Sequence, residues 1–359
     1  MPLQPNVLER FLIRRGVVPS LLVDLGIPLF QLFAMLGAME IGFFRHLEEG
    51  PATVPTLAQR TDASERGIAR LVQILEPLGY IEEENGRYRL TDLARDMPIE
   101  LLGPMATYLK SQAIGTLSEL DRGLREAPED GVYGWEHVQS GEVGRGYQAS
   151  MRWLASGTVD EVVDKISLPD GAERMLDVGG SHGLYTVGFC EKYPELTGSV
   201  LDWEIGLKEA RKTLDDHPEM GDRIDLVERD FEEEALPEGY DFAFLGNIIH
   251  GIDPTGNRAL FDKLAQATTD RGMIGVVDQF AGISGSQFSR AVAGLVGLNL
   301  FLFSGGRSYE ADDVKQWLAD VGFTQNTLHD LNQPGFSLLV AWKDEATPRR
   351  SGFFSWSNG

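Results

Sequence analysis

At residues 175–183 the chain reads Met175-Leu176-Asp177-Val178-Gly179-Gly180-Ser181-His182-Gly183, a short apolar strand that runs into a glycine-rich turn. Residues 184–189 then open a helix. Gly179 and Gly180 lack side chains, so the backbone can come close to a ligand, and Gly183 lets the helix pack on the strand. The segment therefore predicts a strand, turn and helix unit with a ligand at its turn.

The spacing of these glycines excludes one common cofactor motif. A dinucleotide fingerprint, G-x-G-x-x-G, that ended at Gly183 would need glycine at position 178, where the chain has Val178. The turn instead fits an acidic-x-Gly-x-x-x-Gly pattern that holds S-adenosylmethionine, with Asp177 as the acidic residue. A tight turn without a ligand remains the alternative.

The composition is that of a folded and strongly acidic protein. Of 359 residues, 42% are apolar and 24% are charged, and the formal net charge is −23. This length predicts two domains. The acid excess repels phosphates, so we expect no nucleic-acid partner. Lys is scarce among the cationic residues, which favours a halophile with a cytosol of high ionic strength over a merely acidic protein.

The cysteine content and the N-terminal sequence indicate a cytoplasmic protein. Cys190 is the only cysteine, which excludes an intrachain disulfide and suits a reducing compartment. The first residues lack the apolar core of a signal peptide. The longest apolar stretch, residues 25–39, is shorter than the roughly 20 residues that span a bilayer. We expect no membrane partner and interpret this stretch as a buried or subunit-interface helix in a homodimer.

The N-terminal region has a winged-helix pattern. Residues 20–48 are apolar and helical in character, and 65–78 predict a helix with Ile68 and Val72 on one face. Two short strands then flank an Asn85-Gly86 turn. The strand before this turn carries three glutamates, 82–84, so a role in dimerisation or as a substrate lid is favoured over DNA binding.

The C-terminal half predicts an α/β fold with a Rossmann-like, doubly wound and mostly parallel sheet. Strand candidates at 174–179, 199–203, 224–229, 240–249 and 273–280 alternate with helical stretches. The last two, 324–331 and 335–342, are separated by only three residues and predict an antiparallel pair. We expect a winged-helix domain over 1–105, a helical linker that forms part of the substrate pocket over 106–170, a cofactor-binding domain over 171–345 and a polar tail over 346–359.

Polar residues follow each predicted parallel strand at the edge where such sheets bind ligands. Asp177 follows the first strand, and Asp202, with Trp203 beside it, follows the second. Asp202 can accept both hydroxyls of a ribose, while Asp230 can meet an adenine amino group and Phe231 can cover the ring. Asn247 and His250 follow the fourth strand and Asp278 the fifth. Any one acid could belong to an ordinary turn, but five successive strand ends form a stronger signal.

His250 is the candidate general base, because an imidazole can accept a proton near neutral pH. Asp278 on the neighbouring strand could hold its tautomer. His182, inside the glycine turn, is a less suitable base and is expected to pack or hydrogen-bond near the cofactor. The remaining histidines show no ligand spacing, so we predict no metal site; they are His46, His137, His217 and His329.

With these residues identified, the chain resembles the S-adenosylmethionine-dependent small-molecule O-methyltransferases, which include plant caffeic acid and flavonoid enzymes and bacterial polyketide-tailoring enzymes. The similarity covers residues 20–343 and implies a homodimer. It places the glycine motif at 177–183, the ribose acid at Asp202, the adenine pair at Asp230-Phe231, the catalytic base at His250 and its orienting acid at Asp278. The family's linking helix corresponds to 147–153, and its Gly-Gly segment to 305–307.

Three departures from the family pattern bear on the chemistry. The plant enzymes have Asp after the catalytic histidine, where this chain has Gly251. A Lys that contacts the cofactor carboxylate corresponds to Gly246, and a second acid that flanks the histidine corresponds to Ser308. Because some relatives bind the cofactor but hydroxylate or decarboxylate, that chemistry stays open, as does a non-catalytic dimeric regulatory module.

The resulting hypothesis is methyl transfer from S-adenosylmethionine to a hydroxyl of a small, apolar and aromatic acceptor, with His250 as the base. The cofactor-binding candidates are Asp177, Gly179, Gly180, Gly183, Asp202, Trp203, Asp230, Phe231 and Asn247. The acceptor-pocket candidates are Met151, Trp153, Asn299 and Phe303, with Asn247 as a further one. Ordinary core packing is the alternative for Met151 and the aromatic residues.

Overall fold

The computed structural model describes residues 6–17, 22–127, 131–132, 134–281 and 287–343. The chain divides into two compact units, Met1–Gln112 and Ala113–Gly359, and each is described by itself. The boundary that the sequence predicts at residue 105 lies a few residues before this division. The polar tail expected over 346–359 lies outside the described residues.

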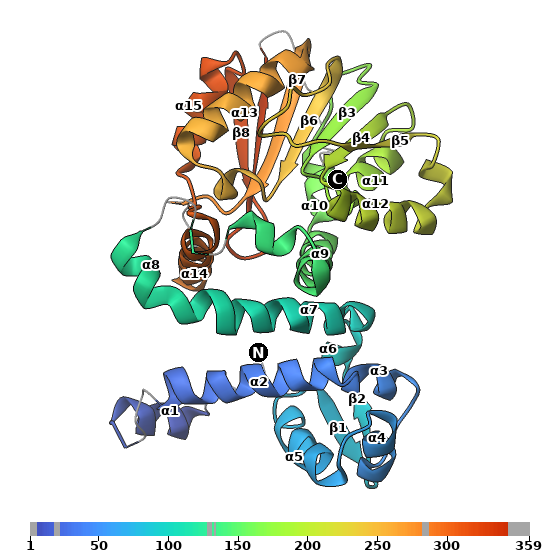
Figure 1. Cartoon of the computed structure of the whole chain (residues 1–359), viewed down its shortest axis with the longest axis vertical. Coiled ribbons are helices and arrows are strands. Elements are labelled where there is room, and N and C mark those ends of the chain that lie inside the picture. Colours follow the sequence, from blue (N-terminus) through green and yellow to red (C-terminus); the bar gives the residue numbers. More distant parts are fainter. Residues whose placement is uncertain (1–5, 18–21, 128–130, 133, 282–286, 344–359) are drawn as a thin grey trace, which may run out of the picture. The chain divides into compact units, whose positions relative to one another are not determined.

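The N-terminal unit is mainly helical (Figure 1). Its helices are α1 (Val7–Arg14), α2 (Ile27–Glu40), α3 (Phe43–Glu48), α4 (Val54–Arg60), α5 (Glu65–Leu75), α6 (Asp92–Arg95) and α7 (Ile99–Ser111). A π-helical turn, Leu22–Gly26, leads into α2. The hydroxyl of Ser64 accepts a hydrogen bond from the Gly67 amide and so caps α5. Fully buried Phe43, Phe44 and Ile68 belong to the apolar core.

A β-hairpin completes this unit, as the sequence predicts. Strand β1 (Ile81–Glu84) pairs antiparallel with β2 (Arg87–Leu90). Asn85 and Gly86, at the turn, have φ values of 54° and 77°. Left-handed values at both positions are typical of two-residue hairpin turns, which explains the Asn-Gly sequence.

The described residues of the second unit form one seven-stranded sheet in the order β5-β4-β3-β6-β7-β9-β8. The strands are β3 (Arg174–Val178), β4 (Thr197–Asp202), β5 (Ile224–Glu228), β6 (Tyr240–Gly246), β7 (Thr268–Asp278), β8 (Gln325–Asp330) and β9 (Ser337–Trp342). Strands β3 to β7 pair in parallel, and β9 runs antiparallel to both β7 and β8. The mostly parallel sheet with an antiparallel end is therefore confirmed.

Strand β6 is shorter than the sequence predicts. The apolar run suggests a strand to residue 249, but β6 ends at Gly246. Asn247 takes a left-handed φ of 61°, which breaks the strand, while its amide still donates to Val277 O at 2.8 Å. A short 3₁₀ turn, Ile249–Gly251, follows and carries His250.

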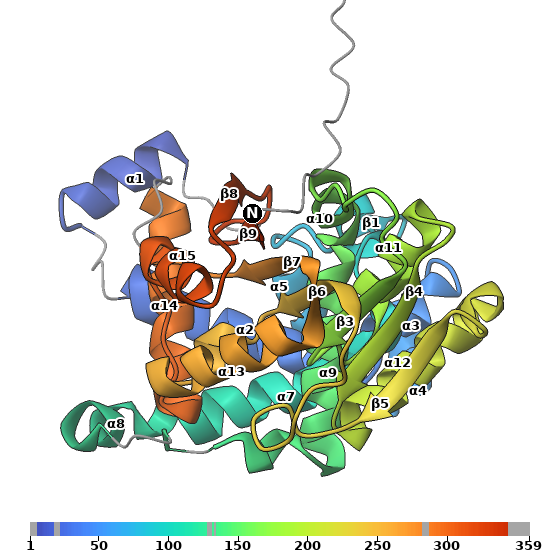
Figure 2. The same ribbon diagram turned by 90° about the horizontal axis from the view of Figure 1, so that it is seen from above.

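Helices cover both faces of the sheet (Figures 1 and 2). The helices among the described residues of this unit are α8 (Leu120–Glu126), α9 (Gly141–Ser156), α10 (Val159–Lys165), α11 (Leu184–Lys192), α12 (Glu204–Asp216), α13 (Pro254–Ala267), α14 (Gln287–Ser304) and α15 (Ala311–Asp320). Side chains alternate along β6: Phe242 and Phe244 join the core beneath α10 to α12, and Ala243 and Leu245 join the core beneath α13 and α15. Cys190 is fully buried in the first of these cores.

Candidate functional site

A cavity lies at the carboxyl ends of β3, β4 and β6, within the second unit. The residues that line it come from the glycine turn, the ends of the strands, helix α9 and the segment before α9. They are Trp135, Tyr147, Gln148, Met151, Ala155, Asp177, Gly179, Gly180, Ser181, His182, Tyr185, Asp202, Trp203, Phe231, Glu232, Gly246, Asn247, Ile248 and Ile252. The sequence-predicted residues in this lining are Met151, Asp177, Gly179, Gly180, Asp202, Trp203, Phe231 and Asn247.

The glycines of the turn are required by close contacts. Gly179 has a left-handed φ of 67°, and a Cβ there would lie 2.3 Å from Ile248 Cδ1. A Cβ on Gly180 would lie 2.5 Å from the carboxyl carbon of Asp177. Gly183 is the N-cap of α11 and does not line the cavity; its left-handed φ of 68°, rather than a close contact, favours glycine there. The first two glycines thus shape the cavity, and the third positions the helix.

Asp177 lies buried just before the glycine turn. Its side chain is buried and accepts a hydrogen bond from the Thr186 hydroxyl at 2.7 Å. Burial raises the pKa of Asp177 to about 7, and the nearby charge of Asp202 adds to the increase. This carboxyl group therefore binds a proton far more readily than an exposed one.

Asp202 binds the glycine turn and faces the cavity. Its Oδ2 accepts from the Ser181 amide at 2.8 Å, and its Oδ1 accepts from the Trp203 amide at 2.6 Å. Burial raises its pKa to about 6 despite these two hydrogen bonds. Each carboxylate oxygen can accept a second hydrogen bond, so the carboxylate retains the capacity to accept a pair of ribose hydroxyls.

The next strand end differs from the sequence interpretation in one residue. Phe231 lines the cavity, but Asp230 does not, because its Oδ1 accepts from the amides of Glu232 and Glu233 at 2.9 and 3.3 Å. Glu232 lines the cavity instead, and burial raises its pKa. Sequence alone could not separate these acids, since three glutamates, 232–234, follow directly after Phe231.

His250 and Asp278 meet as the sequence predicts. His250 Nδ1 lies 2.7 Å from Asp278 Oδ1, and both side chains are buried. The Gln279 amide also donates to Asp278 Oδ1, at 2.7 Å. Although neither residue lines the cavity, the 3₁₀ turn of His250 lies between two residues that do, Ile248 and Ile252.

The Gly-Gly segment packs against the backbone of this turn. The Arg307 amide donates to His250 O at 2.9 Å. A Cβ on Gly306 would lie 2.2 Å from the same oxygen. Gly306 therefore allows the close approach that holds His250 in place.

Trp135 is a cavity residue that sequence reasoning missed. It begins a 3₁₀ turn, Trp135–Val138, in the glycine-rich break before α9. Its indole packs edge-on against Phe303, with ring centroids 5.1 Å apart, and against Tyr147 at 6.2 Å. Phe303 thus contacts the cavity wall without lining it. No periodic pattern marks such a loop residue in the sequence.

The other acceptor candidates divide between the cavity and its surroundings. Met151 lines the cavity, together with Tyr147, Gln148 and Ala155 on the same face of α9. Trp153 lies on α9 with 47% of its surface exposed and does not line the cavity. Asn299 is half-buried on α14, also outside the lining.

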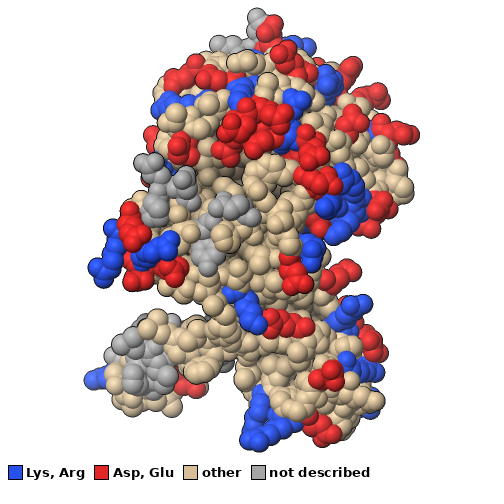
Figure 3. Space-filling model, in the orientation of Figure 1, with Lys and Arg blue, Asp and Glu red and all other residues tan. Residues whose placement is uncertain are grey.

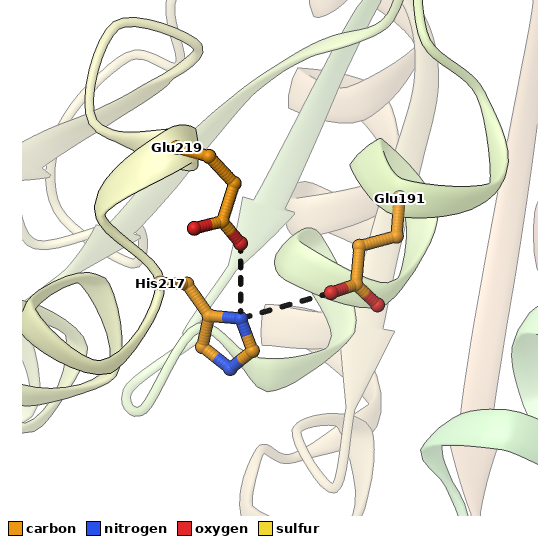
Figure 4. Close-up of side chains that lie close together, drawn as sticks. All are labelled: Glu191, His217 and Glu219. Atoms are coloured by element: carbon orange, nitrogen blue, oxygen red, sulfur yellow. Dashed lines mark ion pairs between the residues drawn. The ribbon is translucent and has the colours of Figure 1, made fainter.

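A separate cluster lies on the surface at the ends of α11 and α12 (Figure 4). His217 Nδ1 is 3.7 Å from Glu191 Oε1 and 3.5 Å from Glu219 Oε1. Sequence spacing did not reveal this grouping, because the three residues come from separate segments. The two carboxylates are exposed, and we interpret the group as ion pairs that form when His217 is protonated.

Comparisons with known proteins identify the family. The model of the O-methyltransferase domain family matches residues 124–324. The 3-hydroxy-5-methyl-1-naphthoate 3-O-methyltransferase of Streptomyces sahachiroi is 26% identical over 90% of this chain and 94% of that protein. The O-methyltransferase SfmM3 of Streptomyces lavendulae is 30% identical over 81% of this chain and 90% of its own length. The chain therefore belongs to the O-methyltransferase domain family.

Solved structures agree with this fold. The mitomycin 7-O-methyltransferase MmcR superposes with a TM-score of 0.76 at 20% identity, over 92% of this chain and 99% of that one. Human N-acetylserotonin methyltransferase, solved with its S-adenosylmethionine cofactor, gives 0.74 at 21% identity, over 91% of this chain and 97% of that one. The protein is an S-adenosylmethionine-dependent O-methyltransferase.

The residues present fit this cofactor. The glycine turn leaves a cradle that a Cβ would fill, and Asp202 offers carboxylate oxygens at its side. Phe231 supplies an apolar ring beside Gly179. An apolar surface for a base, next to an acceptor pair for a ribose, is the donor and acceptor set that a nucleoside requires.

Proposed function

We propose that this enzyme methylates a hydroxyl group of a small aromatic molecule, with His250 as the general base. The observation that carries the proposal is the 2.7 Å contact between His250 Nδ1 and Asp278 Oδ1 beside the cofactor cavity. Related enzymes are named for a naphthoate and for mitomycin, which supports a small aromatic acceptor.

In the proposed cofactor site, the backbone of Gly179 and Gly180 would lie against the nucleoside. Asp202 would accept from the ribose hydroxyls and Phe231 would cover the adenine ring, while Glu232, rather than the predicted Asp230, would meet the adenine amino group. Trp203 and Asn247 complete the wall. When bound, S-adenosylmethionine supplies an electrophilic methyl group.

His250 and Asp278 act on the acceptor. The Nδ1 proton of His250 points to Asp278, so Nε2 carries the lone pair that accepts the proton of the acceptor hydroxyl. The ionised Asp278 then stabilises the imidazolium that forms. General base catalysis of this kind contributes on the order of 10²–10⁴-fold in rate, and positioning of the reactants contributes about 7–11 kcal/mol.

We assign the acceptor pocket to the aromatic and apolar side chains around Trp135. Met151 lines the cavity, and Phe303, outside the lining, packs edge-on against the indole of Trp135. Among the sequence candidates, Asn299 is half-buried and Trp153 is exposed, and neither lines the cavity. An aromatic wall favours a planar acceptor.

Replacement of His250 by Ala tests the base. Calorimetry with S-adenosylhomocysteine should show unchanged affinity, because His250 lies outside the cavity lining. Transfer of labelled methyl to hydroxylated naphthoates should fall on the order of 10²-fold or more. Full retained activity would exclude His250 as the base, and product without label would indicate hydroxylation or decarboxylation instead.

We further propose that the N-terminal unit, with its helix and hairpin arrangement of winged-helix type, forms a homodimer. Val7 and Phe11 on α1 are 82% and 51% exposed, and Phe30 and Phe33 on α2 are 75% and 42% exposed, so both helices present apolar surface. Figure 3 shows almost only uncharged residues along α2. Apolar patches of this kind mark interfaces.

The acidic surface supports a cytoplasmic location in a cell of high ionic strength. Asp and Glu outnumber Lys and Arg on the visible face of the second unit (Figure 3). Within the described ranges, no helix combines the length and the apolar character needed to cross a bilayer. Salt would screen the repulsion that a net charge of −23 creates.

A further inference from the structure

The cavity offers no ion partner to the carboxylate of an amino acid. Among its lining residues that the structure describes, none is Lys or Arg, while Asp177, Asp202 and Glu232 are acids. At Gly246 a Cβ would lie 3.4 Å from the ring of Tyr185, whose hydroxyl pairs with Thr158. The α-carboxylate of the cofactor therefore needs uncharged donors.

His182 provides one such donor. Its Nδ1 accepts a hydrogen bond from the Leu184 amide at 3.1 Å, which places the proton of the neutral imidazole on Nε2. Burial, with the positive charge of Arg152 adding to it, lowers the pKa of His182 to about 3. The ring is thus a neutral donor with one fixed tautomer, and it lines the cavity.

Gln148 provides the second. It is 5% exposed, and its Oε1 accepts from the Ser181 hydroxyl, which orients the amide and leaves Nε2 as a donor. The amide of Ser181 also donates to Asp202, the proposed ribose-binding acid, so Ser181 links Gln148 to Asp202. Gln148, His182 and Asp202 therefore surround one residue of the glycine turn.

We propose that Gln148 and His182, as uncharged hydrogen-bond donors beside Ser181, bind the α-carboxylate of the cofactor. This assignment rests on the proposed cofactor site and extends it to the amino-acid end. Hydrogen bonds to a charged group are stronger than neutral ones, so the two donors can replace a cation.

The test compares two ligands by calorimetry on the full chain. S-adenosylhomocysteine carries the carboxylate, and 5′-methylthioadenosine has the same nucleoside without the amino-acid end. Gln148→Met removes the donor at nearly constant length, and Gln148→Glu adds a repelling charge. We expect both variants to lose about tenfold or more in affinity for S-adenosylhomocysteine, with affinity for methylthioadenosine within about twofold.

His182 is tested by rescue. His182→Leu should weaken only S-adenosylhomocysteine, and His182→Gln, whose amide can reach the position of Nε2, should restore much of the loss. Trp153→Phe, on α9 but exposed and outside the cavity lining, is the control that should leave the ratio of the two affinities unchanged.

Three results would overturn the assignment. They are equal losses for both ligands in the Gln148 and His182 variants, unchanged S-adenosylhomocysteine binding, and a wild-type chain that binds the two ligands equally. A wild-type chain that binds neither would instead overturn the cofactor site itself.

Discussion

The indole of Trp135 occupies the space that a side chain at residue 251 would fill. A Cβ built on Gly251 lies 2.5 Å from Trp135 Cζ2, closer than real Cβ contacts allow. Gly251 directly follows the proposed base, His250. Where the plant enzymes that the chain resembles have Asp, this chain therefore has no room for a side chain beside the indole.

Gly251→Ala should displace that ring. We expect destabilisation of about 1–3 kcal/mol, the usual effect of overpacking, and a weaker acceptor affinity with S-adenosylhomocysteine binding unchanged. Thermal unfolding measures the change in stability. Trp fluorescence, with Trp135→Phe for comparison, measures the displacement of the ring and the binding of the acceptor. Gly157→Ala is the control, because its nearest neighbour to a new Cβ is Leu154 O at 3.7 Å. Equal stability of both variants would mean that the indole is not fixed there.

Asp278→Asn should lower kcat by about 10²-fold or more, since an amide neither fixes the Nδ1 proton nor stabilises an imidazolium. Single-turnover methyl transfer is the measurement. Binding of S-adenosylhomocysteine should be preserved, because Asp278 lies outside the cavity lining. If kcat recovers fully at high pH, Asp278 is not needed to orient the base.

Asp177→Asn should stabilise the protein more at pH 8 than at pH 4.5. The pKa of Asp177 rises from 3.8 to about 7 on folding, so the folded chain holds this proton more tightly. In the wild type, this proton therefore contributes to the free energy of unfolding. The contribution is complete below about pH 4 and is lost as the pH rises to 7, by up to about 1.4 kcal/mol per pH unit.

Thermal unfolding of the ligand-free protein at several pH values measures this difference. Asp225→Asn, at an exposed position on β5, is the matched control for the loss of a carboxylate away from the cavity. A constant gap between Asp177→Asn and the wild type would contradict the raised pKa.

Phe30→Glu and Phe33→Glu should convert the proposed dimer into a monomer, because each places a charge on the apolar surface of α2. Light scattering measures the change. Leu295→Glu, at a 68% exposed position in the second unit, should leave the mass unchanged. A monomeric wild-type chain would remove the basis of this proposal.

Added KCl should raise the unfolding temperature until the repulsion within a chain of net charge −23 is screened. Melting curves from low to molar KCl test this, and equal effects of KCl and NaCl would indicate general screening. A flat or falling curve would exclude adaptation to high salt.

Much of the fold could be predicted because its signals are local. The apolar strands, the glycine turn and the Asn85-Gly86 hairpin each occupy a few consecutive residues, and the structure confirms them. The meeting of His250 with Asp278 could also be predicted, since parallel strands end at one edge of a sheet.

The rest depends on contacts between distant segments. Asp230 accepts hydrogen bonds from backbone amides of its own loop, and the folded loop places Glu232 rather than Asp230 in the cavity lining. Trp135 lies in a loop without periodicity, and Gln148 becomes a candidate only when Ser181 is seen beside it. A run of polar residues cannot show which member turns inward until the backbone of the loop is known.

The single thiol has a practical consequence. Cys190 lies fully inside the core of the second unit, and burial raises its pKa to about 11. Thiol reagents act on the thiolate, so the native chain should remain unmodified while folded. One cysteine introduced on α2 and a second on the rim of the cavity could then carry a pair of fluorophores or spin labels, which would allow the distance between the two units to be followed in solution without removing Cys190.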